Sequence, residues 1–192
     1  MKQYIFYLIF MFFLLSCKTN QVYNIRDYDD KSHFVKIDKI EYLKPNIKYN
    51  IDGTEYNTDT LSRIYKVTRK NTLILSNAKR NNYAQRKIVN LYGIKGCDQG
   101  GHIIGRQFGG SPNIDNLIPI NKRLNIGEMR KTEMEWRDNL NEGNEIKDII
   151  INIEYIYTNM RPNIIKINYT VDKDYTNYKV IKIFTNIAET NN

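Results

Sequence analysis

The sequence predicts an α+β fold with a largely antiparallel sheet, and three observations support this prediction. The C-terminal third consists mainly of β-rich runs separated by short polar turns: IKDIIINIEYIY, RPNIIKINYTV and YKVIKIF. Asp52 and Gly53 stand between two strand-like segments and indicate a hairpin turn. A strong helical pattern occurs over residues 127–140, with Gly143 as a stop signal. Many strands with one strong helix are typical of an α+β domain.

The elements follow in order along the chain. Residues 17–32 are polar and charged, and we expect a tether there, followed by one domain over residues 33–188. Residues 77–87 are polar and basic and are predicted to form a loop or a short helix. The patterns predict strands at residues 33–43, on both sides of Asp52 and Gly53, and at residues 62–68, 72–75, 88–94, 146–157, 161–171 and 178–184.

Length and composition describe a single basic domain. The chain has 192 residues, of which 41% are hydrophobic, enough for a real core. The net charge of +8, from 29 Lys+Arg against 21 Asp+Glu, favours a polyanionic partner, either nucleic acid or an anionic membrane surface. Two cysteines, Cys17 and Cys97, and two histidines argue against a disulfide-built fold and against a structural zinc site.

Residues 1–16 are predicted to be a signal peptide. Lys2 precedes an apolar run from Ile5 to Ser16, which is shorter than the roughly 20 residues that span a bilayer. A short membrane anchor is the alternative. The sequence LLSC at residues 14–17 resembles a bacterial lipobox, which implies a lipid on Cys17 and a membrane anchor through it. We therefore expect an exported protein, either an envelope lipoprotein or a plainly secreted one.

The predicted helix contains a carboxylate that its pattern does not explain. Ile126, Met129, Trp136 and Leu140 share one helical face, and Glu133 falls near the middle of this stripe. A carboxylate that faces a core costs several kcal/mol unless it is paired or lies near a metal. Glu133 is therefore paired with a cation, or lies at the exposed margin, or has a functional role.

Asn125 also has two competing interpretations. It stands just before the predicted helix, with Glu128 three residues on, as in an N-cap followed by a capping glutamate. Taken alone, this pattern favours the cap, and binding of a metal ion through the amide oxygen is the competing interpretation. A side chain that ligates a metal does not easily cap as well, so the two interpretations exclude each other.

Three ordered blocks carry a family resemblance. They are DQGGHIIGRQFGG at residues 98–110, NLIP at residues 116–119 and LNIGEMRKTEMEW at residues 124–136. Together with RNNYAQRK at residues 80–87, they resemble the DNA/RNA non-specific endonucleases, in particular their bacterial secreted and toxin-like branch. The resemblance covers roughly residues 53–171. It implies a sheet that carries a ββα-metal nuclease finger, with the histidine at a strand end and the asparagine at a helix start.

The resemblance also implies roles for single residues. His102 falls on the general base, Asn125 on the magnesium-binding asparagine, and Glu133 on the helix glutamate that holds the metal through water and takes part in catalysis. Asn116 matches a position of the second motif that helps hold the active site and is grouped with the catalytic residues. The implied cofactor is Mg²⁺ or another divalent cation such as Mn²⁺.

The first motif matches the family with one departure. Asp98 is its opening acid and Gly101 precedes the histidine, but Gln99 stands where many members have arginine. The cation that clamps the phosphate is therefore open, and three arginines are candidates for substrate binding: Arg86, Arg106 and Arg130.

These residue types suit phosphodiester hydrolysis. A neutral histidine with a pKa near 6.5 can take a proton from water at physiological pH. Gly100 and Gly101 are expected to let nucleic acid approach His102, and Gly109 and Gly110 to let the chain turn sharply toward residues 116–119. Mg²⁺ prefers oxygen ligands and keeps several waters, which one asparagine and a carboxylate can supplement.

The sequence thus predicts an exported, Mg²⁺-dependent endonuclease that cuts DNA and RNA with little sequence specificity. The alternative is a non-catalytic basic lipoprotein that binds nucleic acid or envelope polyanions through a degenerate nuclease fold. His33 and Cys97 are expected to be structural. The sequence leaves open whether an inhibitor or immunity protein binds the domain.

Overall fold

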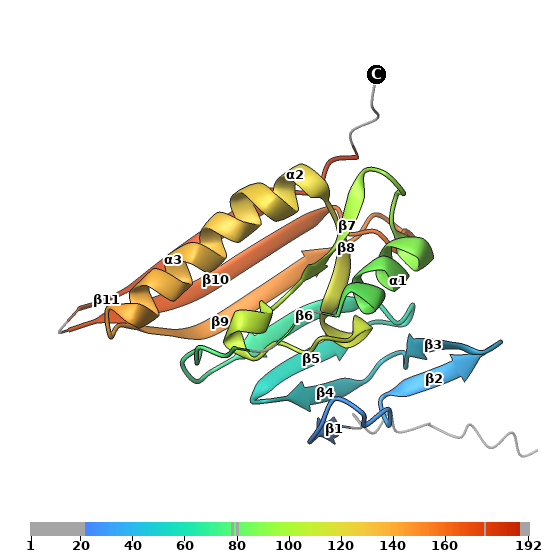
Figure 1. Ribbon diagram of the computed structural model, residues 1–192, viewed down its shortest axis with the longest axis horizontal. Helices are drawn as coiled ribbons and strands as arrows, with labels where there is room; N and C mark the ends of the chain where they lie inside the picture. Colours follow the sequence, from blue (N-terminus) through green and yellow to red (C-terminus); the bar gives the residue numbers. More distant parts are fainter. Residues whose placement is uncertain (1–21, 78, 80, 175, 189–192) are drawn as a thin grey trace, which may run out of the picture.

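A computed structural model describes residues 22–77, 79, 81–174 and 176–188 (Figure 1). The predicted signal peptide and the lipidation site Cys17 lie outside these residues. The main sheet has seven strands in the order β1-β4-β5-β6-β9-β10-β11. β1 pairs in parallel with β4, and the other neighbours are antiparallel, which confirms the predicted fold class. The strands are β1 (Val22–Ile25), β4 (Lys48–Ile51), β5 (Thr54–Thr58), β6 (Ile64–Arg69), β9 (Glu145–Glu154), β10 (Ile164–Lys173) and β11 (Thr176–Thr185).

Two hairpin turns show how local chemistry shapes the N-terminal half. Asp52 and Gly53 have φ values of 49° and 77°, and they join β4 to β5 as predicted. Residues 33–43 do not form the single strand that the alternation of apolar and polar residues predicted. They form a hairpin of β2 (Phe34–Ile37) and β3 (Ile40–Leu43), because Asp38 and Lys39 adopt left-handed φ values of 47° and 67° and reverse the chain.

Three further expectations need correction. The expected tether is structured from residue 22, since β1 joins the main sheet beside β4. Residues 72–75 form no strand and contact β9 through two hydrogen bonds, from the Leu73 amide to the Ile146 carbonyl and from the Ile146 amide to the Thr72 hydroxyl. The expected strand at residues 88–94 is largely the second half of helix α1 (Asn82–Tyr92). Asn81 caps this helix by accepting a hydrogen bond from the Ala84 amide.

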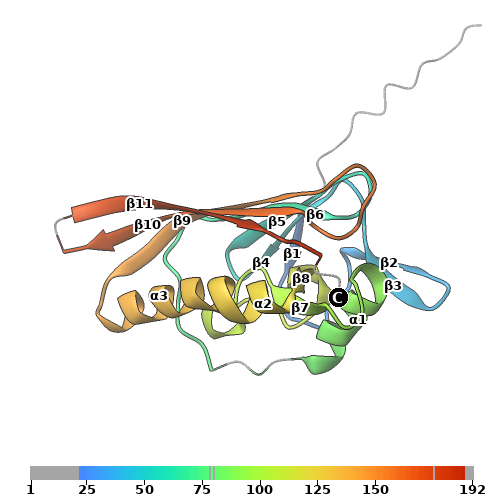
Figure 2. The ribbon, with the colours of Figure 1, turned by 90° about the horizontal axis from the view of Figure 1, so that it is seen from above.

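All helices lie on one face of the sheet (Figure 2). The long helix packs on this face through Trp136, which is fully buried and makes edge contacts with Phe108 and Tyr169 at centroid distances of 5.7 and 5.4 Å. The core beneath it is rich in isoleucine from β9 and β10. Across the described part of the chain, no helix combines the length and the apolar character that crossing a membrane requires.

A two-stranded ribbon followed by a helix forms the predicted ββα finger. β7 (Asp98–His102) pairs antiparallel with β8 (Leu117–Asn121), and the chain then enters one continuous helix over residues 122–141. This helix comprises α2 (Lys122–Leu124), a π-helical turn (Asn125–Met129) and α3 (Arg130–Asn141). It begins five residues earlier than predicted.

The capping interpretation of Asn125 is wrong. Asn121 is the cap, and its Oδ1 accepts hydrogen bonds from the amides of Arg123 at 2.8 Å and Leu124 at 3.4 Å. Asn125 lies inside the helix with φ −61° and ψ −48°. The π turn adds a residue to the spiral, so Ile126 leaves the predicted apolar stripe and is 53% exposed.

Candidate active site

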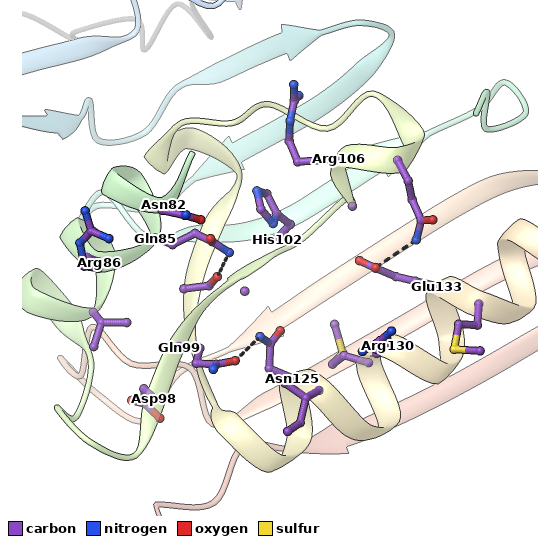
Figure 3. A pocket seen from close by; sticks show the side chains of 18 of the residues that line it. Asn82, Gln85, Arg86, Asp98, Gln99, His102, Arg106, Asn125, Arg130 and Glu133 are labelled. Atoms are coloured by element: carbon purple, nitrogen blue, oxygen red, sulfur yellow. Dashed lines mark hydrogen bonds between the residues drawn. The ribbon is translucent and has the colours of Figure 1, made fainter. Parts of the chain in front are cut away.

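Most of the predicted site residues, but not Asn116, line a cavity of about 1020 Å³ between β7, α1 and α3 (Figure 3). His102 is half-buried at the end of β7, where it pairs with Leu117 of β8. Asn125 from the π turn and Glu133 from α3 line the same cavity. A potential base from β7, an amide oxygen from the π turn and a carboxylate from α3 therefore line the same cavity.

Asn125 approaches the ribbon through a gap that glycine leaves. Its Nδ2 donates a hydrogen bond to Gln99 Oε1 at 3.0 Å. Its Oδ1 lies over Gly101, where a Cβ would be only 2.8 Å away. The hydrogen bond directs the donor end of the amide to Gln99 and leaves the carbonyl oxygen over the glycine.

Glu133 faces the cavity rather than the core. It is half-buried, and its Oε2 accepts a hydrogen bond from Gln107 Nε2 at 3.2 Å. A Cβ at Gly105 would lie 2.6 Å from Glu133 Oε1. The missing side chain of Gly105 thus makes room for this carboxylate, which accounts for an acid on an otherwise apolar helical stripe.

The two glycines before His102 line the cavity, and they also allow close packing. Both are buried. A Cβ at Gly100 would meet the Gln85 carbonyl oxygen at 2.5 Å, and Gln85 Nε2 donates to the Gly100 carbonyl at 3.0 Å. Gly100 therefore lets α1 lie directly on β7, while Gly101 leaves room for Ile120 and Asn125.

Asn116 does not reach the cavity. It is fully buried, and its Oδ1 accepts hydrogen bonds from the Tyr56 hydroxyl and the Ile104 amide, both at 3.0 Å. Its Nδ2 donates to the carbonyls of Ile104 at 2.8 Å and Ser111 at 3.0 Å. Burial raises the pKa of Tyr56 well above its usual range, which keeps this phenol a donor. Asn116 therefore holds the segment after His102 in place from outside the cavity.

The three candidate arginines differ in their surroundings. Arg86 on α1 and Arg130 on α3 are exposed at the cavity. Arg106 is buried, its Nε donates to the Lys79 carbonyl at 3.0 Å, and its guanidinium lies 5.1 Å from the Tyr28 ring centroid. Arg106 lines the cavity but mainly braces the fold, so it is the poorest candidate for contact with substrate.

Two basic residues at the cavity escaped the sequence analysis. They are Lys95, which follows α1, and Arg137 on α3. Arg137 stands seven residues after Arg130, which places both on one face of the helix, about 10 Å apart along its axis. This spacing was visible in the sequence, whereas the position of Lys95 depends on how the loop before β7 folds.

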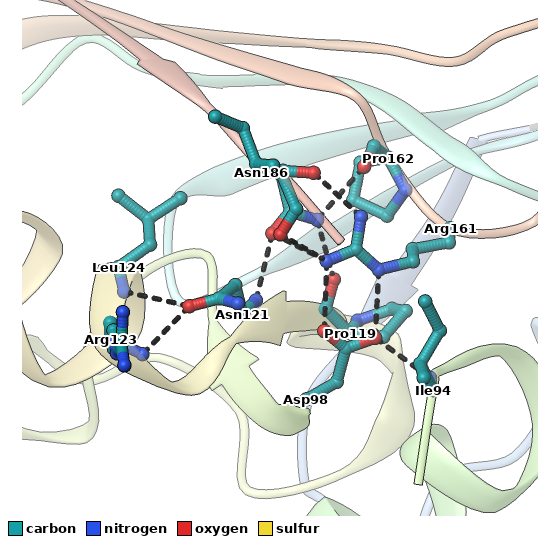
Figure 4. A network of polar contacts seen from close by, with 10 residues as sticks. Ile94, Asp98, Pro119, Asn121, Arg123, Leu124, Arg161, Pro162 and Asn186 are labelled. Carbon is teal, nitrogen blue, oxygen red and sulfur yellow. Dashed lines mark hydrogen bonds and ion pairs between the residues drawn. The ribbon is translucent and has the colours of Figure 1, made fainter. Parts of the chain in front are cut away.

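Asp98 lines the cavity, but its carboxylate is bound in an ion pair (Figure 4). Arg161 Nε and Nη2 donate to the two carboxylate oxygens at 2.8 and 2.9 Å, and the Ile94 amide donates to Oδ2 at 2.8 Å. Arg161 also donates to the Asn186 carbonyl at 2.6 Å. Asp98 thus ties the start of β7 to the C-terminal segment, through a partner that lies too far along the chain for sequence spacing to indicate.

The oxygen donors suit a hard divalent cation. Within the described ranges, no three or more His, Cys, Asp or Glu side chains are grouped as a metal cluster. The cavity instead offers the Asn125 amide oxygen and the Glu133 carboxylate, each beside a glycine whose Cβ would occupy the space next to the oxygen. Few protein ligands and room for water are what Mg²⁺ or Mn²⁺ requires.

Comparison with known proteins identifies the family of the chain. A family model described as DNA/RNA non-specific endonuclease matches residues 45–173. The type VII secretion system protein EssD of Staphylococcus aureus, from strains USA300 and NCTC 8325 / PS 47, is 34% identical over 163 residues. The matched region is 78% of this chain but 26% of each relative, so the chain spans about a quarter of the length of these relatives.

Proposed function

The chain belongs to the DNA/RNA non-specific endonuclease family, and we propose that it is a divalent-metal-dependent endonuclease that hydrolyses DNA and RNA in the cavity beside His102. One observation carries this proposal. His102, Asn125 and Glu133 line one cavity, although they come from a strand end and two turns of a helix. This arrangement places a base and oxygen ligands on the lining of one cavity.

In the proposed mechanism, His102 acts on the attacking water. Its imidazole accepts a proton while the water oxygen bonds to phosphorus and the bond from phosphorus to the leaving sugar oxygen breaks. The half-buried position of His102 at a strand end holds the ring toward the cavity. Asn116 limits the movement of this strand end, because it binds both the amide and the carbonyl of Ile104.

Asn125 Oδ1 would bind a divalent cation directly, and Glu133 would hold it through water. When bound, the cation supplies Lewis-acid stabilisation of the negative charge on the phosphate and on the leaving oxygen. Gln107 contributes by donating to Glu133 Oε2, which keeps the carboxylate toward the cavity.

Basic side chains on two sides of the cavity, the α1 side and the α3 side, would hold the polyanionic substrate. Arg86 and Lys95 lie on the α1 side, and Arg130 and Arg137 lie on α3. Contacts to phosphates carry no sequence information, which agrees with cleavage of DNA and RNA at many sequences. Binding through them should weaken steeply as salt rises.

Export is part of the proposal. The relative EssD is named as a protein of a type VII secretion system, which supports a role outside the cytoplasm for the shared nuclease region. We also propose that residues 1–16 are a signal peptide that directs export. A lipid on Cys17 would then hold the exported chain at the membrane.

Cleavage of supercoiled plasmid and of a long RNA by the purified chain tests the proposed activity. With Mg²⁺ or Mn²⁺, both substrates should be degraded; with excess EDTA, cleavage should stop, and added Mg²⁺ should restore it. Binding of both nucleic acids without cleavage under any metal condition would favour the non-catalytic alternative. Cleavage that is unchanged in EDTA would refute the metal requirement.

A further inference from the structure

The amide of Asn125 has two orientations of similar shape but opposite chemistry. With the oxygen toward the cavity, the side chain is a ligand for a cation; with the nitrogen there, it offers only N–H donors. A group that holds the amide in the first orientation therefore favours binding of a cation. The backbone of the π turn does not select this orientation, because rotation of the amide about its last bond leaves the helix unchanged.

Gln99 is placed to hold the Asn125 amide in one orientation through a hydrogen bond. It lies on β7, three residues before His102, and its register partner on β8 is Ile120. Its Oε1 accepts the hydrogen bond from Asn125 Nδ2 at 3.0 Å, between two half-buried side chains. Both residues line the cavity, and Figure 3 shows this bond crossing from the strand to the helix.

We propose that Gln99 is a positioning residue that orients the Asn125 amide so that its oxygen faces the cation. This inference rests on the proposed function, since it concerns the metal site of that activity. It also gives a physical role to the one departure from the motif. An arginine here has only N–H donors and could not accept the bond from Asn125 Nδ2, whereas glutamine can. Groups that orient metal ligands typically change metal affinity by about 10–100-fold when they are removed.

The test measures Mn²⁺ binding to the full chain by electron paramagnetic resonance, without nucleic acid. Gln99→Met keeps the length of the side chain and removes the amide. It should weaken Mn²⁺ binding by at least about tenfold. Gln99→Glu keeps an acceptor at this position and should bind Mn²⁺ at least as tightly as wild type.

A second background separates orientation from general damage. Asn125→Asp presents an oxygen in either orientation, so it has no amide to orient. In this background, Gln99→Met should change Mn²⁺ binding by less than about threefold. Unfolding of each variant in metal-free buffer checks that the fold is intact.

The outcomes distinguish this inference from the proposed function. Three results would each overturn the role of Gln99 and leave the proposed nuclease activity in place. Gln99→Met could bind Mn²⁺ with wild-type affinity, or it could lose the same affinity in both backgrounds. Gln99→Glu could also lose as much Mn²⁺ affinity as Gln99→Met. A wild-type chain that binds no Mn²⁺ would overturn both the metal site and the role of Gln99.

Discussion

Asn125 and Glu133 reach the cavity because the residues opposite them carry no side chain. Gly101 lies beneath the Asn125 oxygen, and Gly105 lies beside the Glu133 carboxylate. Neither glycine has a left-handed φ, so their role is space and not backbone freedom. The shape of the site therefore depends on two glycines without a Cβ as well as on the side chains proposed to react.

Gly105→Ala should impair the enzyme without unfolding it. The backbone at residue 105 has φ −58° and ψ 147°, which alanine adopts readily, but its Cβ would lie 2.6 Å from Glu133 Oε1. The carboxylate must move, and we expect plasmid cleavage to fall at least tenfold while the free energy of unfolding changes by about 1 kcal/mol or less.

Gly127→Ala is the matched control. Gly127 lies in the helix, and a Cβ added there would meet no atom within 4 Å. Alanine should therefore leave cleavage intact and stabilise the helix by up to about 1 kcal/mol. If Gly105→Ala and Gly127→Ala cleave equally well, the space beside Glu133 is unimportant.

The order of the finger's elements could be predicted from the sequence, but the helix geometry could not. The resemblance placed His102 at a strand end and Asn125 at the start of a helix, and β7, β8 and the following helix have this arrangement. The π turn was not predicted, because apolar spacing assumes 3.6 residues per turn; it moved Ile126 off the stripe. Asn121, the true cap, was hidden because it ends a buried strand.

The basic residues of α3 that line the cavity should account for most of the salt dependence of DNA binding. Arg130 and Arg137 lie on the same helical face, about two turns apart, so each can contact a phosphate. Arg130→Gln with Arg137→Gln should lower the slope of log K against log salt by about 2 for duplex DNA. Fluorescence anisotropy in EDTA, where cleavage is blocked, measures this slope.

Lys131→Gln on the same helix provides the comparison. Lys131 is exposed and does not line the cavity, so the slope for this variant should stay close to that of wild type. Equal slopes for the double arginine variant and Lys131→Gln would show that nucleic acid binds elsewhere.

At the scale of the whole molecule, contacts distant in sequence hold the finger on the sheet. Asp98 at the start of β7 pairs with Arg161, which also donates to Asn186 in the C-terminal segment. Asn186 Oδ1 in turn accepts from the Asn121 amide at 2.8 Å, directly before the helix of the finger. These partners are not visible in local patterns, so the sequence identified Asp98 as a motif residue but not what it binds.

Arg161→Met should destabilise the fold strongly. It would leave the fully buried Asp98 side chain without its bidentate partner, and breaking a buried pair from one side costs about 3–5 kcal/mol. Urea unfolding followed by circular dichroism measures this loss. Lys166→Met removes the exposed pair with Glu154 and should cost about 1 kcal/mol or less. A loss for Arg161→Met no larger than for Lys166→Met would show that the network does not hold the finger.

The plasmid cleavage rate of His102→Ala in Mg²⁺ tests whether His102 is the base of the proposed nuclease. His102 is half-buried at a strand end, so the variant should unfold at nearly the same urea concentration as wild type. Its cleavage rate should be about 10²–10⁴-fold lower, the usual contribution of a general base. A folded His102→Ala chain that cleaves plasmid at the wild-type rate would show that His102 is not the base.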